Sequence, residues 1–226
     1  HLPQPTLAAV IILAVFNLIK FKPIKYAWRV QKHDAIVAVI TFILTLWWAP
    51  HLEKSILVGV VLSMGLYMYR TMRPRIAVLA MQSDGTLGDA EANILKTCPK
   101  IAVLRFDGSL FFANTGYFEE KVLERVAIKP GLKFIIIDAE GINEIDATGE
   151  EMLHQLAVRL SGLGIDFLFC RTKKQVMDVF RRTGFAGDEW LDHFHRNEQE
   201  AINFAWQRLD NHDDSCCPLS RSKSSS

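Results

Sequence analysis

Three long apolar runs dominate the first third of the chain. They cover Pro5–Ile19, Ala35–Ala49 and Ser55–Tyr69, and none contains Asp, Glu, Lys or Arg. The runs are apolar on all sides, whereas a surface helix of a soluble protein has one apolar stripe. Each run gives roughly 22 Å of helix, against about 30 Å of hydrocarbon in a bilayer, so a buried core helix is the alternative. The predicted transmembrane helices span about 5–19, 33–50 and 55–70.

The rest of the chain alternates short apolar runs with amphipathic segments. Uninterrupted apolar runs predict buried strands, and apolar residues at every third or fourth position predict helices. The predicted strands are Ile76–Ala80, Ile101–Phe106, Phe134–Ile137 and Ile165–Cys170, with Leu110–Ala113 as a further strand or a turn. The predicted helices are Asn114–Ala127, Ala147–Leu163, Lys173–Thr183 and Arg196–Leu209. This alternation predicts an α/β domain whose mixed sheet is flanked by helices.

These patterns divide the chain into a membrane part and a rear domain. Residues 1–70 hold the three predicted transmembrane helices, 71–99 a linker with the first strand, and 100–208 the core of the α/β domain. Met81–Pro99 is polar and contains glycine, so we predict a loop there. Residues 209–226 end in a Ser-rich polar stretch and are predicted to be disordered.

Charge is distributed unevenly between the two parts. Residues 1–75 contain nine Lys/Arg and two acids, whereas the remainder contains 17 basic and 23 acidic residues. The front basic residues gather in the predicted loops Lys20–Asp34 and Arg70–Arg75, with one more in His51–Lys54. The positive-inside rule places the loops Lys20–Asp34 and Arg70–Arg75 in the cytoplasm, together with the rear domain that follows them. The acidic rear domain argues against a nucleic-acid partner, which needs a basic face.

The cysteine pattern indicates free thiols. The cysteines are Cys98, Cys170, Cys216 and Cys217. They form neither a C-x-x-C motif nor the spacing of a disulfide framework. We therefore expect a reducing compartment around the rear domain, in agreement with its cytoplasmic placement.

The remaining reactive side chains predict no catalytic or metal site. Asp192, His193, His195 and Glu198 lie close in sequence, but an H-x-H pair on a helix points its rings apart. No P-loop, dinucleotide fingerprint or nucleophile elbow is present. The sequence thus predicts neither an enzyme nor a bound cofactor or metal.

The stretch Phe134–Leu153 joins a buried strand to the clearest helix start of the chain. The helix opens with Asp146, Ala147, Thr148 and Gly149, and Glu151 follows three residues after the threonine. Thr148 and Glu151 can form a capping box, or Asp146 can cap the helix instead.

The third apolar run holds Ser55, Gly59 and Ser63, whose spacing arises by chance or serves close helix packing in lipid.

Longer stretches of this sequence resemble a known family. "YRTMRPRIAVL", "IAVLRFDGSLFFAN", "FIIIDAEGINEIDATG" and "GIDFLFC" resemble the C-terminal portion of SulP anion transporters, the sulfate permease group, including its cytoplasmic STAS domain. The resemblance covers roughly residues 1–208. It implies three scaffold helices and a regulatory STAS domain of a secondary active transporter for sulfate, bicarbonate-like anions or a dicarboxylate.

The resemblance also implies what lies outside this chain. The family's anion site lies between half-helices upstream of His1, so no substrate-binding residue is assigned here. The implied partners are the lipid bilayer of an inner or plasma membrane, an N-terminal membrane domain, a second copy in a homodimer, and cytosolic proteins that dock on the STAS domain. The alternative is a stand-alone, membrane-anchored STAS module for signalling or docking.

The helix start resembles a second group, the anti-sigma-factor antagonists, which use a STAS fold and phosphorylate a serine in a D-S-S-G turn. That position is Thr148 here, which makes it the candidate phosphorylation site. A phosphate adds about −1.5 to −2 charge at a helix N-terminus, which the helix dipole favours and the neighbouring acids oppose. Asp146, Ala147, Gly149 and Glu151 complete the predicted STAS loop and helix start.

Overall fold

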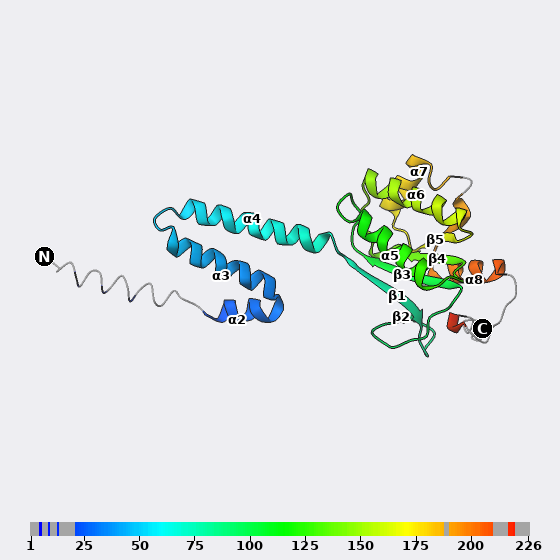
Figure 1. Ribbon diagram of the computed structural model, residues 1–226, viewed down its shortest axis with the longest axis horizontal. Coiled ribbons are helices and arrows are strands. Elements are labelled where there is room, and N and C mark those ends of the chain that lie inside the picture. Colours follow the sequence, from blue (N-terminus) through cyan, green and yellow to red (C-terminus); the bar gives the residue numbers. More distant parts are fainter. Residues whose placement is uncertain are drawn as a thin grey trace. The chain divides into compact units, whose positions relative to one another are not determined.

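The computed structural model describes residues 21–187, 190–209 and 217–219, together with Pro5, Ala9 and Leu13. The chain forms two compact units, His1–Arg70 and Thr71–Ser226. Helices make up the described part of the first unit, and a sheet with flanking helices makes up the second (Figure 1).

The first unit contains the helices α2 (Phe21–Val30), α3 (Lys32–Trp47) and α4 (Leu52–Thr71). The prediction of a loop before Asp34 was therefore wrong, because α2 occupies most of that segment and only Gln31 separates it from α3. A proline in the first turn, such as Pro23, does not prevent a helix, since the amide it lacks has no partner there.

The helix α4 is the one candidate membrane span among the described residues, with 20 residues and sufficient hydropathy. The helix α3 has 16 residues, which is short for a span. The first predicted span, 5–19, lies almost wholly outside the described residues. The number of spans therefore stays a prediction.

Small residues of α4 pack directly on α3. Ser55 is fully buried, and its Oγ donates a hydrogen bond of 3.2 Å to the carbonyl oxygen of Leu44. A Cβ atom on Gly59 would lie 2.7 Å from Cγ2 of Thr41. Ser63 is exposed in the described part of the unit. Ser55 and Gly59 thus serve close helix packing, as in membrane helix pairs.

Replacing Gly59 by leucine is expected to separate α3 from α4 and to weaken their association by about 1–3 kcal/mol. The side chain of Thr41 occupies the space that the new side chain needs. Detergent denaturation of the full chain, followed by circular dichroism, measures the effect. Gly65→Leu is the matched control on the same helix, because nothing lies within 4 Å of its Cβ position. Equal losses in both variants would contradict the packing.

The described residues of the second unit form one mixed sheet in the order β2-β1-β3-β4-β5-β6. The strands are β1 (Arg75–Met81), β2 (Leu87–Asp89), β3 (Ile101–Asp107), β4 (Phe134–Asp138), β5 (Asp166–Cys170) and β6 (Phe194–His195). The strand β1 runs antiparallel to β2 and β3, and β3 through β6 run parallel. The predicted α/β class with a mixed sheet is confirmed.

Two short segments differ from their predictions, and a third adopts one of its two predicted alternatives. The strand β2 lies inside Met81–Pro99, which we predicted to be a loop. The strand β6 has two residues, too few for a periodic signal. Leu110–Ala113 is a turn that contributes only a bridge between Leu110 and Ile145. Short strands form where a neighbouring strand offers unpaired backbone groups, which sequence periodicity does not report.

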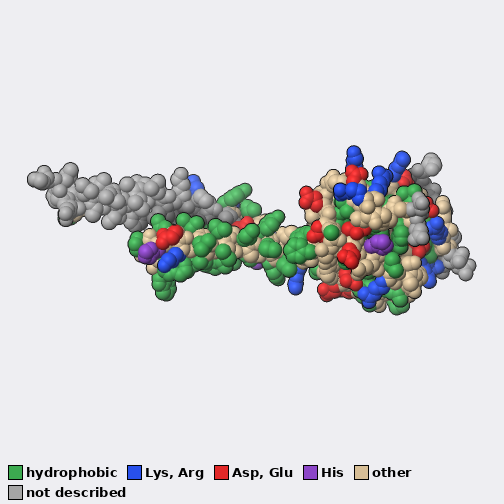
Figure 2. All heavy atoms as spheres, turned by 90° about the horizontal axis from the view of Figure 1, so that it is seen from above, with side chains coloured by type: hydrophobic (Ala, Val, Ile, Leu, Met, Phe, Trp, Pro, Cys, Tyr) green, Lys and Arg blue, Asp and Glu red, His purple; other side chains and the backbone are tan. Residues whose placement is uncertain are grey.

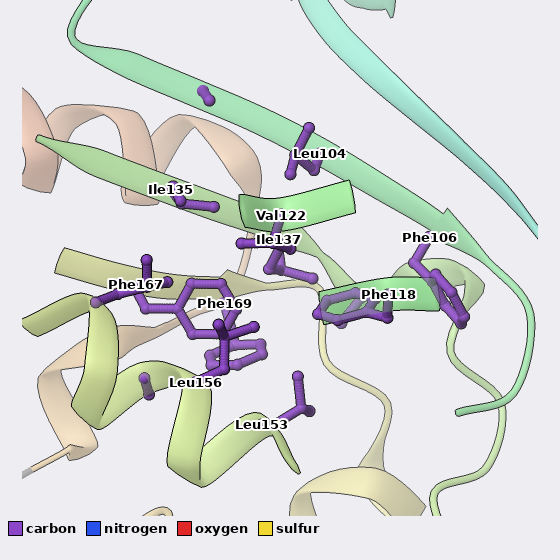
Figure 3. Packing of buried hydrophobic residues seen from close by; sticks show 14 of the residues in the cluster. Leu104, Phe106, Phe118, Val122, Ile135, Ile137, Leu153, Leu156, Phe167 and Phe169 are labelled. Carbon is purple, nitrogen blue, oxygen red and sulfur yellow. The ribbon is translucent and has the colours of Figure 1, made fainter. Parts of the chain in front are cut away.

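The helices of this unit cover the two faces of the sheet. They are α5 (Thr115–Ile128), α6 (Ala147–Gly162), α7 (Lys174–Thr183) and α8 (Glu198–Arg208), with short 3-10 turns at Ala139–Gly141 and Leu191–His193. The helices α5, α6 and α7 share one core cluster with the sheet. In this cluster Leu153 and Leu156 of α6 point toward the strand residues Ile137 and Phe169 (Figure 3). The opposite face carries α8.

The C-terminal segment 217–219 also packs on the α8 face. Cys217 and Leu219 are 5% and 2% exposed, so the prediction of a disordered tail was wrong for these residues. Cys217 forms a disulfide with Cys98, 119 residues earlier, so the prediction of four free thiols was also wrong. Spacing rules detect local frameworks, and folding alone brings these two residues together. Cys170 is free and buried.

Candidate functional site

The start of α6 forms a turn that Asp146 organises. Its Oδ1 accepts a hydrogen bond of 2.7 Å from the backbone N–H of Gly149, and its Oδ2 accepts one of 2.9 Å from the N–H of Phe112. Asp146 is therefore the N-cap of α6. A capping carboxylate satisfies an amide that the helix leaves unpaired. The second bond ties the turn to the loop after β3.

The loop after β3 holds this turn against the domain. The N–H of Leu110 donates to the carbonyl of Glu144 at 2.9 Å, and the N–H of Asp146 donates to the carbonyl of Leu110 at 3.2 Å. Asn114 is 1% exposed. Its Nδ2 donates to the carbonyl of Thr71, the last residue of α4, at 3.3 Å. The loop is therefore bonded both to the turn and to Thr71, the first residue of the second unit.

The residues after the cap divide into a buried and an exposed pair. Gly149 and Glu150 are buried, whereas Ala147 and Thr148 are exposed. In the described part of the chain the hydroxyl of Thr148 makes no hydrogen bond. Glu151 accepts instead from Gln155 at 3.1 Å, so the alternative of a Thr148–Glu151 capping box is wrong. The Thr148 hydroxyl is thus accessible to a modifying enzyme or a partner.

Two further residues shape this turn. A Cβ atom on Gly149 would lie 2.8 Å from the carbonyl oxygen of Leu110, so this position needs glycine for the close approach of the loop. Phe112 is 64% exposed although it is a large apolar residue. Aromatic side chains are enriched at protein–protein interfaces, so this ring is a candidate docking contact. The sequence shows Phe112 only as part of an apolar pair, so its exposure was not predicted.

Replacing Asp146 by alanine is expected to cost the rear unit about 1–2 kcal/mol of folding free energy, because the cap and the bond to Phe112 are both lost. Thr148→Val is expected to change the stability by less than about 0.5 kcal/mol, since the hydroxyl is exposed. Urea unfolding of residues 71–226 measures both. A loss in Thr148→Val as large as that in Asp146→Ala would contradict the assignment of the turn to Asp146 alone.

A cluster of charges lies at the carboxyl ends of β4 and β5. Asp138 is fully buried, and its Oδ1 and Oδ2 accept hydrogen bonds of 3.0 and 2.5 Å from Arg171. Arg171 also contacts Glu140 at 2.8 Å and Glu198 at 3.0 Å. Burial disfavours the charge of Arg171, but the bond to Asp138 and the other carboxylates outweigh it and raise the pKa of Arg171. The ion pairs of Arg171 therefore hold the ends of β4 and β5 and the start of α8 together.

The histidines next to this cluster are separate from it. His193 belongs to a 3-10 turn and His195 to β6, and both lie before the last predicted helix, Arg196–Leu209. Burial lowers the pKa of both imidazoles, which keeps them neutral near pH 7. Among the described residues no group of three or more His, Cys, Asp or Glu can hold a metal ion. Glu198, the acid that we considered with them, contacts Arg171 instead.

Comparison with known proteins identifies the rear unit. The family model described as "STAS domain" matches residues 93–201. This range covers β3 through the start of α8 and includes the Asp146 turn.

Similar proteins extend beyond the STAS domain. The "Probable sulfate transporter 4.2" of Arabidopsis thaliana is 28% identical over 209 residues, covering 84% of this chain and 30% of that protein. The "Low affinity sulfate transporter 3" of Stylosanthes hamata is 25% identical over 199 residues, covering 82% of this chain and 31% of that protein. The chain therefore spans about 30% of the length of these curated relatives.

A solved structure shares the fold of both parts. The murine Solute Carrier 26 family member A9 anion transporter, in its inward-facing state, superposes with a TM-score of 0.72 at 22% identity. The match covers 81% of this chain and 30% of that one. The matches agree with the mixed sheet described above. Residues 93–201 match a STAS domain, and the chain is similar to sulfate transporters over 84% of its length.

Proposed function

We propose that the chain is the C-terminal portion of a secondary active transporter of inorganic anions, with scaffold helices followed by a regulatory STAS domain. The observation that carries this proposal is the order of the parts: a helix pair suited to lipid leads directly into a STAS domain. The relatives are named as sulfate transporters, and none of those reported above is named as an enzyme. Sulfate is the first anion to test, with bicarbonate and a dicarboxylate as the alternatives.

The surface of α3 and α4 supports a place in the membrane. Their large apolar side chains are exposed on every side except the contact between the two helices, and Phe42, Leu57 and Met64 are each more than 60% exposed. Apolar side chains cover these helices, whereas charged ones gather on the rear unit (Figure 2). Exposing an apolar surface of this extent to water is unfavourable, so lipid or further helices would cover it.

The ends of the helix pair support a cytoplasmic STAS domain. Arg70, near the end of α4, donates a hydrogen bond of 2.5 Å to Gln31 and lies 3.8 Å from Asp34 at the start of α3. The basic helix α2 and the basic segment Arg70–Arg75 therefore flank the same end of this helix pair. By the positive-inside rule this end faces the cytoplasm of an inner or plasma membrane.

The Asp146 turn supports a regulatory role for the STAS domain. Thr148 offers an accessible hydroxyl, and Phe112, which is bonded to Asp146, offers an exposed ring. Phosphorylation of Thr148 or a docked cytosolic protein would act on this turn. A homodimer and an upstream membrane domain complete the proposed assembly, and the anion site lies in that upstream domain.

Uptake of radiolabelled sulfate into liposomes that contain the whole protein tests the proposal. We expect saturable uptake that excess unlabelled sulfate abolishes, and competition by bicarbonate or a dicarboxylate defines the substrate class. Gly59→Leu is expected to reduce uptake more than Gly65→Leu, because only the first disturbs the contact of α4 with α3. Absence of uptake of all three anions by folded protein would contradict the proposal.

A further inference from the structure

Two different segments of the chain pack on the face of the sheet opposite α5 and α6. The helix α8 packs on β4, β5 and β6. The same core cluster continues onto β1 and β3 through Ala77, Leu79 and Val103, each at most 4% exposed. The C-terminal residues Cys217 and Leu219 belong to this cluster as well. The C-terminal segment 217–219 thus helps to cover an apolar face that the domain's last helix leaves open.

The segment is joined to the domain by the disulfide between Cys217 and Cys98. The Cys98 end is firmly held, because the ammonium group of Lys129 donates to the carbonyl oxygen of Cys98 at 2.7 Å and to Oγ1 of Thr97 at 2.8 Å. At the other end, the side chains of Cys217 and Leu219 are buried. Such burial offsets the conformational entropy of roughly one or two ordered residues. The covalent bond therefore adds to the burial that holds the segment in place.

We propose that Cys98 and Cys217 form a redox switch that fastens the C-terminal segment over the face of β1 and β3 when oxidised and releases it when reduced. The inference takes the cytoplasmic placement of the domain from the proposed function. Disulfides are rare in that compartment, and those that form there usually respond to redox state. The test below reads thiols and protease cleavage, so its outcome is independent of whether the protein transports anions.

The proposed step is a thiol–disulfide exchange with a dithiol. One thiolate of the dithiol attacks a sulfur of the Cys98–Cys217 bond, and the mixed disulfide that forms is resolved by the second thiolate. The protein gains two electrons and two protons as two thiols, and the dithiol becomes a disulfide. Both cysteines are at most 5% exposed, so the attack requires local opening of the segment.

Redox titration of the full chain in detergent tests this proposal. The protein is equilibrated with oxidised and reduced dithiothreitol, treated with a maleimide mass tag, digested and mapped. In the oxidised samples we expect a pair of peptides joined by the disulfide between Cys98 and Cys217. On reduction we expect the maleimide tag on both residues, and reoxidation is expected to restore the disulfide. Cys170 serves as an internal control, because it is fully buried and stays unlabelled while the domain remains folded. Burial also raises the pKa of its thiol.

Limited chymotrypsin digestion of the same samples reports the position of the segment. We expect cleavage after Leu219, which is 2% exposed, to be about tenfold faster in the reduced chain, since cleavage follows the population of the open form. Cys98→Ser and Cys217→Ser are expected to show the fast rate with and without reductant. Cys216→Ser is the matched control and is expected to behave like the unmodified chain.

Three results would overturn the inference. The first is the absence of a Cys98–Cys217 peptide after oxidation, and the second is a bond from Cys98 to Cys216 in its place. The third is cleavage after Leu219 at the same rate in both redox states. If Cys98→Ser unfolds the domain, Cys217→Ser decides the cleavage comparison, because it leaves the Cys98 end of the core unchanged.

Discussion

Replacing Gly141 by alanine is expected to cost the STAS domain more than about 3 kcal/mol of folding free energy. The Cβ atom would lie 2.1 Å from the carbonyl oxygen of Phe106 and 2.9 Å from Cα of Asp107. Both atoms belong to the backbone of β3, which pairs with β1 on one side and β4 on the other. The strand cannot move away without breaking a ladder of hydrogen bonds, so the clash persists.

Urea unfolding of residues 71–226, followed by circular dichroism, measures this effect. Gly116→Ala is the matched control, since nothing lies within 4 Å of its Cβ position in α5. Alanine is the better helix former, so this control is expected to gain about 0.5–1 kcal/mol. A Gly141→Ala domain as stable as the unmodified one would show that the turn after β4 does not pack on β3 as described.

Replacing Arg171 by alanine is expected to cost about 3–5 kcal/mol, because the fully buried carboxylate of Asp138 loses its charged partner. The loss is expected at pH 7, where Asp138 would remain buried and unpaired. Arg171 has a φ of 54°, a conformation that a side chain disfavours. Arg171→Gly is therefore expected to be about 1 kcal/mol less damaging than Arg171→Ala, although both remove the guanidinium group.

The same unfolding experiment tests this prediction with Arg105→Ala as the control. Arg105 pairs with Asp107 at 3.0 Å at the end of the neighbouring strand β3, but a third of each side chain is exposed. Exposed pairs contribute about 0–1 kcal/mol, so the control is expected to change little. Equal effects of Arg171→Ala and Arg105→Ala would contradict the role of the buried pair.

The strands β3, β4 and β5 were predictable because each is an uninterrupted apolar run, buried on both faces. The helix α6 was predictable from its apolar stripe and from the acid before it. The strand β6 and the basic helix α2 were not, because two residues carry no period and basic residues around Pro23 favour a loop. The strand β6 forms because it pairs with β5. The helix α2 lies directly before α3, with only Gln31 between them.

The site was predictable in its position but not in its bonding. The sequence left the cap of α6 open between Thr148 and Asp146, and the bond from the Gly149 amide decides for the acid. The second bond of Asp146, to Phe112 34 residues earlier, has no local signal in the sequence. Arg171 has a signal that we did not use: Asp138 and Arg171 each sit at or just after the end of a buried parallel strand. Charged residues at neighbouring carboxyl ends of a parallel sheet lie close together.

The central proposal is that this chain is one part of an anion transporter, and the mass of the native protein tests it most directly. An antibody raised against residues 71–226 detects the protein in its own membranes, and mass spectrometry of the captured protein gives its intact mass. We predict a mass more than twice that of these 226 residues, as two inverted repeats of membrane helices require. A native protein with the mass of these 226 residues alone would contradict the claim and would favour a stand-alone, membrane-anchored STAS module.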